Sequence, residues 1–175
     1  MSHANNIHLD LIIKCCLPTE LEAQAIVIPT SSQGYMSQGT GALIKSLVGD
    51  EIEKEILEIA PLAIGSAAVT SVGNLEMFRK AIHVPNRLMD ASPARIEHIR
   101  QSVRAGLVAA KMQGFESIVI PGPGPCANHI SKKEIARAII DEIRNFRESP
   151  PETVYLVDTN EIIVRNLEGF AFPQK

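Results

Sequence analysis

The residues best placed to do chemistry lie in the stretch SIVIPGPGPCANHISKKE, from Ser117 to Glu134. The stretch begins as an apolar strand and ends as a helix start, because Ser131 and Glu134 are spaced as a capping box. Glycines let a backbone approach an anion without a Cβ in the way, and a helix start presents free N–H groups. We therefore expect either a loop that holds a ligand or a loop that only turns the chain.

A second segment, Gln24–Leu47, has the same design of buried strand, glycine-rich loop and helix start. Such loops lie at the carboxyl edge of a parallel sheet, where ligands tend to bind, and two of them side by side would suit a diphosphate. The alternative is that every strand-to-helix turn needs glycine, proline or serine. Proline has no N–H to offer an anion, so Pro121, Pro123 and Pro125 weaken the phosphate interpretation of the Ser117–Glu134 loop.

Cys126 is the candidate nucleophile, because a helix start lowers the pKa of a nearby thiol and His129 follows three residues later. The alternative is a small residue that fills a tight turn, and no third orienting group is evident. No His and Cys spacing is typical of a metal site, so we predict neither a metal nor a cofactor.

Strand and helix patterns alternate along the chain, which predicts an α/β fold with a mixed, largely parallel sheet. Asp50 with Glu53 predicts a capped helix, and Ser92-Pro93 predicts the start of a long helix that ends before Gly114. The tail, residues 159–175, is ambiguous. The predicted strands are Ile7–Lys14, Gln24–Pro29, Gly65–Val72, Lys80–Pro85, Glu116–Pro121 and Thr153–Asp158.

Composition predicts one domain over residues 1–175, because 45% hydrophobic content supports one sizeable core. A net charge of −3 with two Tyr and no Trp argues against nucleic acid as a partner. No apolar run is long enough to cross a membrane, and the start of the chain lacks the features of a signal peptide. The odd count of three cysteines indicates reduced thiols and a cytoplasmic protein.

Taken in order, these segments resemble the macro domain, an ADP-ribose-binding module, over about residues 7–158. The resemblance implies a three-layer α/β/α macro-domain-like fold with a mixed, largely parallel central sheet. The similar segments are QAIVIPTS at Gln24–Ser31 (family DAIVNAAN), GSAAVTSVGNL at Gly65–Leu75 (GEAVITPGYNL), AIHVP at Ala81–Pro85 (VIHTVGP) and SIVIPGPGPCANHISKKEIAR at Ser117–Arg137 (SIAFPAIGTGVYGFPKEEAAR).

The chain departs from the family mostly where the ligand would lie. The two asparagines of the family's NAAN fall on Ile28 and Ser31, and the acidic residue that recognises adenine falls on Leu17. Two later glycines fall on Cys126 and His129. The resemblance therefore implies the fold more strongly than the activity.

We expect a binding module for ADP-ribose or a related phosphorylated nucleotide, with no catalytic residue identified. The alternatives are an ADP-ribosyl hydrolase with a remodelled active site, and a degenerate macro fold used in protein assembly. A homo-oligomer is left open. The predicted ligand-binding residues are Ser31, Ser32, Gly39, Thr40, Gly41, Gly122, Gly124, Cys126, Ala127, Asn128 and Asp158.

Overall fold

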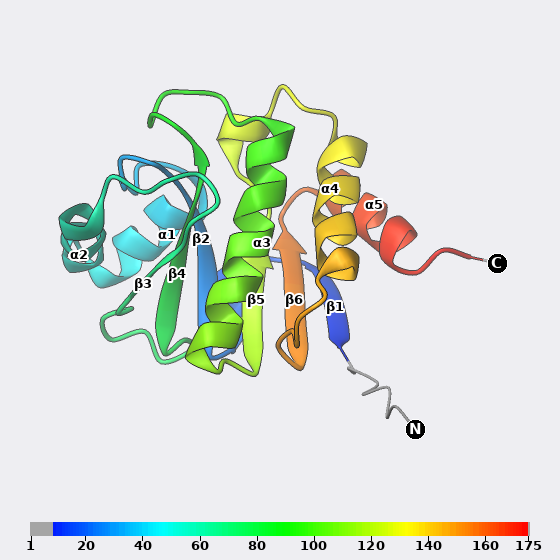
Figure 1. Cartoon of the computed structure of the whole chain (residues 1–175), viewed down its shortest axis with the longest axis horizontal. Helices are drawn as coiled ribbons and strands as arrows, with labels where there is room; N and C mark the ends of the chain where they lie inside the picture. The colour runs from blue at the N-terminus through cyan, green and yellow to red at the C-terminus, as the bar shows by residue number, and fades with distance from the viewer. Residues whose placement is uncertain (1–8, 175) are drawn as a thin grey trace.

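A six-stranded sheet runs through the computed structural model, which describes residues 9–174 (Figure 1). Its strand order is β1-β6-β5-β2-β4-β3, and all neighbours are parallel except β3, which runs antiparallel to β4. The sheet is thus mixed and largely parallel, as predicted. The strands are β1 Asp10–Cys15, β2 Ala25–Ser31, β3 Ala68–Thr70, β4 Lys80–Arg87, β5 Ser117–Pro121 and β6 Thr153–Asp158.

Helices cover both faces of the sheet and complete three layers, which confirms the predicted fold class. In Figure 1, α3 and α4 lie in front of the strands, and α1 and α2 lie together at the β3 end. The helices are α1 Gly39–Val48, α2 Glu51–Ile59, α3 Ile96–Gln113, α4 Lys132–Asn145 and α5 Glu161–Ala171, with short 3-10 turns at Pro18–Glu20 (η1) and Pro125–Ala127 (η2).

Strand β2 shows why the sheet is buried on both sides. Its alternate residues Ala25 and Val27 belong to the core shared with α3, α4 and α5. Ile26 and Ile28 belong to the opposite core, with α1 and α2. A strand whose side chains are apolar in both directions needs cover on both faces, as an α/β fold provides.

Two predicted boundaries and one predicted capping box were wrong. The long helix begins at Ile96 rather than at Ser92-Pro93, because the N–H of Ala94 donates to the Cys126 carbonyl (2.9 Å) and Arg95 is extended. The strand predicted at Gly65–Val72 shortens to β3. Asp50 stands at the predicted N-cap of α2, but its side chain makes no capping hydrogen bond. The Glu53 carboxylate accepts from the Met36 N–H and from Lys45 instead of from the Asp50 N–H.

Other boundaries were predicted correctly. Ser131 caps α4, and its Oγ accepts the Glu134 N–H at 3.1 Å. The ambiguous tail contains α5, which is capped by the side-chain oxygen of Asn160. The predicted start of the first strand, at Ile7, lies outside the described residues.

Candidate ligand-binding cleft

Two loops meet at the carboxyl edge of the sheet. Loop 1, residues 32–38, joins β2 to α1, and loop 2, residues 122–131, joins β5 to α4. The loops are neighbours because β2 and β5 pair in parallel. A cavity of about 330 Å³ lies here, and we call it the cleft. Its lining comprises Cys16, Leu17, Pro18, Gly39, Thr40, Leu43, Pro121, Gly122, Gly124, Pro125, Val157, Asp158 and Thr159.

A second cavity of about 250 Å³ adjoins the cleft. The two cavities share four lining residues, Gly124, Pro125, Asp158 and Thr159. We call it the side chamber. Its other lining residues are Pro123, Ala127, Asn128, Lys132, Ile135, Asn160 and Ile163.

The structure brings most of the predicted ligand-binding residues together around these two cavities. Gly39, Thr40, Gly122, Gly124 and Asp158 line the cleft. Gly124 and Asp158 also line the side chamber, with Ala127 and Asn128.

Four predicted residues line neither cavity. Ser31 is fully buried, and among the described residues its hydroxyl and that of Ser32 find no hydrogen-bond partner. The pairing of β2 with β4 shifts register between Thr30 and Ser31, and such an irregularity redirects the side chains that follow. Gly41 packs within the core instead, where a Cβ would lie 3.4 Å from Met36. The fourth is Cys126, whose thiol contacts Asn86 and Arg87 in a polar cluster behind loop 2.

Asp158 is the charged group on the wall shared by the two cavities. Its side chain lies directly over Gly122, so that a Cβ at that glycine would overlap the carboxylate. Burial raises the pKa of the Asp158 carboxyl above its ordinary value, opposed by the Asn160 N–H and by the charge of Lys132. The carboxylate also accepts the Asn160 N–H at 2.8 Å. The Asp158 carboxylate, on the wall of both cavities, could therefore accept a hydrogen bond from a ligand hydroxyl.

The polar cluster behind loop 2 is built around Arg87, which is only 2% exposed. Its guanidinium donates to Asn86 Oδ1 (3.2 Å) and to Asp90 Oδ1 (3.2 Å). The Cys126 thiol contacts Asn86 and the Pro123 carbonyl at 3.8 and 3.3 Å. Burial raises the pKa of that thiol despite the nearby Arg87 charge. The geometry therefore favours a protonated packing thiol over a nucleophile.

Sequence reasoning missed Arg87 and Asp90 as supports of the loops. Asp90 accepts from Ser37 Oγ (2.6 Å) and, through its carbonyl, from the Gln38 amide (3.1 Å), while its N–H donates to Gln33 (2.8 Å). The available signal was an arginine two residues after the mostly apolar segment Ala81–Pro85, because a charge that is buried with a strand requires partners.

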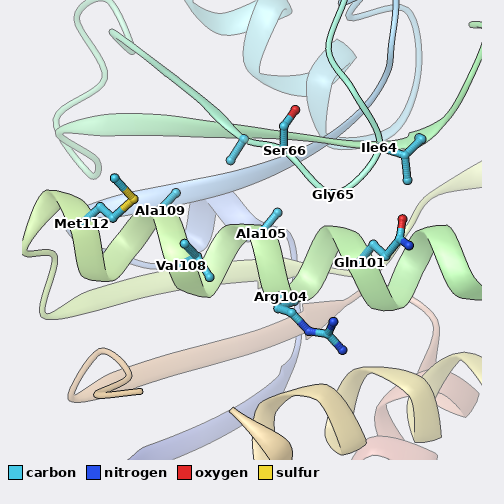
Figure 2. A pocket seen from close by; sticks show the side chains of 10 residues that line it. Ile64, Gly65, Ser66, Gln101, Arg104, Ala105, Val108, Ala109 and Met112 are labelled. Carbon is cyan, nitrogen blue, oxygen red and sulfur yellow. The ribbon is translucent and has the colours of Figure 1, made fainter. Parts of the chain in front are cut away.

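The structure also contains a groove of about 410 Å³ between α3 and the segment before β3 (Figure 2). Figure 2 shows Ala105, Val108 and Ala109 on the helix side, with Arg104 pointing away toward α4. Arg104 is already paired with Glu142 at 2.7 Å. The groove thus lacks both a glycine-rich loop and a free charge, and the cleft is the better candidate site.

Within residues 9–174, no group of three or more His, Cys, Asp or Glu side chains is arranged to hold a metal ion. No helix in this part of the chain is both long and apolar enough to span a membrane.

The macro domain family model matches residues 27–139, which is more than half of the chain. The chain belongs to the macro domain family. An uncharacterized protein of Aquifex aeolicus is 40% identical over 150 residues, which cover 86% of this chain and 90% of the relative.

Solved macro domains share the fold at low identity. The Trypanosoma brucei macrodomain aligns with a TM-score of 0.80 and 17% identity, over 96% of this chain and 69% of its own. A mutant of the Oceanobacillus iheyensis macrodomain, solved with ADPR, aligns with a TM-score of 0.78 and 21% identity, over 97% of this chain and 95% of its own. These identities are too low to carry a ligand from one chain to the other, so the likeness describes the fold.

Proposed function

We propose that this macro domain binds ADP-ribose or a related phosphorylated nucleotide in the cleft. The observation that carries the proposal is the cavity of about 330 Å³ between loop 2 and the start of α1, at the carboxyl edge of the sheet. Its position suits a ligand in an α/β fold, and its volume lies within the range of small-molecule sites.

The lining of the cleft contains both apolar and polar side chains. Leu17, Leu43 and Val157 provide surfaces against which a flat base can pack. Asp158 and the hydroxyl of Thr40 can hydrogen-bond to a sugar. A nucleotide combines these two kinds of surface in one molecule.

The part of the cleft lined by Leu17 and Pro18 differs from the family pattern in a way that bears on affinity for the base. Leu17 stands where the resemblance places an adenine-recognising acid, and its own N–H already donates to Glu20 at 2.6 Å. Pro18 has no N–H to donate. We therefore propose binding through packing in this part of the cleft, without hydrogen-bond selection of the base.

Hydrolysis has less support than binding. The Ser31 hydroxyl lies outside both cavities, and the Cys126 thiol faces Asn86. We also propose a cytoplasmic location, because all three cysteines are free thiols.

Isothermal titration with ADP-ribose, with AMP and phosphate as controls, tests the proposal. We expect micromolar binding without turnover. Thr40→Phe should abolish the heat by filling the cleft, and Ser46→Phe on the exposed face of the same helix should retain it. No heat at millimolar concentrations of any of the three ligands would overturn the proposal.

A further inference from the structure

The cleft is narrow where loop 2 meets the start of α1. A Cβ at Gly39 would lie 3.6 Å from Pro125 Cδ and 3.8 Å from Gly124 Cα, so the two backbones approach each other closely. Neither the cleft nor the side chamber is lined by Ser31 or Ser32, which lie where β2 meets loop 1. A ligand in the cleft therefore meets a constriction in the direction of loop 1.

Loop 2 has few backbone donors left for a phosphate. The N–H groups of Ala127 and Asn128 donate to the carbonyls of Gly124 and Pro125 at 3.1 Å each. The Gly122 N–H donates to Val157. The prolines of the loop have no N–H at all. Loop 2 alone therefore offers an anionic group few contacts, and a positively charged partner would add to them.

The side chamber supplies that partner. Lys132 lines the side chamber, and Asp158 forms part of the wall that the side chamber shares with the cleft. Within residues 9–174 no hydrogen bond or ion pair holds the Lys132 ammonium, whose charge acts on the Asp158 carboxyl. This lysine also stands in the first turn of α4, where the helix dipole disfavours a cation. A bound anion would offset that cost.

We propose that the phosphate subsite of this protein is the side chamber around Lys132, and that it suits a nucleoside 5′-monophosphate. The inference rests on the proposed function and specifies its ligand. The base packs between Leu17 and Val157, a sugar hydroxyl donates to Asp158, and the phosphate contacts Lys132. The ligand then turns away from loop 1 and does not need to pass the constriction at Gly39.

The test compares AMP with adenosine by titration of the full chain and two variants. In the unmodified protein the phosphate should improve affinity about tenfold, as a charge-assisted contact would. Lys132→Met should remove this advantage and leave adenosine binding unchanged. Lys133→Met, at the exposed neighbour in the same helical turn, should preserve it. Thermal unfolding of both variants checks that they fold.

The outcomes separate this inference from the proposed function. An AMP-to-adenosine ratio that survives Lys132→Met would overturn the Lys132 subsite. ADP-ribose binding at least about tenfold tighter than AMP, and insensitive to Lys132→Met, would also overturn it while the proposed function stands. If adenosine, AMP and ADP-ribose all fail to bind, both fall together.

Discussion

Loops 1 and 2 connect a buried strand to a helix in the same way, but they are held by different forces. Loop 1 is held largely by polar contacts with other parts of the chain. The Asp90 carboxylate accepts from Ser37 Oγ, the Asp90 carbonyl accepts from the Gln38 side-chain amide, and Glu53 accepts the Met36 N–H. Loop 2 is fixed mainly by its own backbone, with Pro123, Pro125 and a 3-10 turn. Loop 1 thus depends mainly on contacts with the charged residues Asp90 and Glu53, and loop 2 on the restricted backbone of its prolines.

This difference shows that one local design can be stabilised in two ways at the same edge of a sheet. Charged contacts can be removed by a substitution at a distant residue, whereas proline acts by restricting the unfolded chain. Both loops nevertheless share one contact, because Arg87 bonds to Asp90 on one side and contacts the Asn86 and Cys126 cluster on the other.

Arg87→Met should have the largest effect, because it removes the contact shared by both loops. The substitution leaves Asn86 Oδ1 and the Asp90 carboxylate without their arginine donor. We expect the free energy of unfolding in urea to fall by about 3 kcal/mol. Hydrogen exchange should quicken in both loops. Arg95→Met, at an exposed arginine, should change stability little; a loss below about 1 kcal/mol in Arg87→Met would contradict the shared role.

Acid should lower the free energy of unfolding through His83, which lies in the sheet and in neither loop. Burial lowers the pKa of His83 on β4 to about 4, below its ordinary value of 6.5, although the charge of Glu55 opposes the shift. Between about pH 6.5 and pH 4, His83 is therefore protonated in the unfolded chain and neutral in the folded chain. Stability is full above about pH 6.5 and is lost as the pH falls toward 4, by about 2 kcal/mol between pH 7 and pH 5.

Urea unfolding at these two pH values measures the effect of His83. The variant His83→Gln should flatten the pH dependence, and His129→Gln, at an exposed histidine of loop 2, should retain it. An unchanged slope in His83→Gln would assign the acid sensitivity to other groups.

Asp90→Ala should separate the loops by weakening chiefly loop 1. It removes the carboxylate that accepts from Ser37 and Arg87, at a cost of about 1.5 kcal/mol in unfolding free energy. Hydrogen exchange should quicken at loop 1 amides more than at loop 2 amides. Glu58→Ala, at an exposed acid on α2, is the control. Equal quickening in both loops would refute the contrast.

Pro125→Ala should have the smallest effect and should act on loop 2. The substitution restores conformational freedom to the unfolded chain and should cost about 0.5 kcal/mol. Pro93→Ala, at an exposed proline outside both loops, serves for comparison. Faster exchange in loop 1 than in loop 2 would show that loop 2 does not depend on its prolines.

The parts of the fold that could be predicted from sequence are those set by local pattern. Apolar runs predicted β2 and β5, although β2 continues past Pro29 to Ser31, and Ser131 with Glu134 predicted the start of α4. These signals depend on residues within a few positions of one another, so they survive whatever surrounds them.

The parts that could not be predicted depend on partners far along the chain. Glu53 had the spacing of a capping residue, but Met36 and Lys45 offered it better partners. Ser31 was predicted to face the ligand, and a register shift that its local sequence does not show buries it instead. In the candidate site, Gly39, Gly122, Gly124 and Asp158 were therefore predictable as cavity residues, while the core position of Gly41, the constriction and the side chamber were not.

The two edge strands of the sheet have a consequence for self-association. At one edge, β3 has only three residues, which gives an incoming strand little length for a hydrogen-bonded ladder. At the other edge, β1 carries the exposed charge of Lys14 close to its end. Short edges and edge lysines are the means by which natural sheets discourage strand addition from another chain. Within residues 9–174 no further strand covers either edge, and these two features discourage edge-to-edge aggregation.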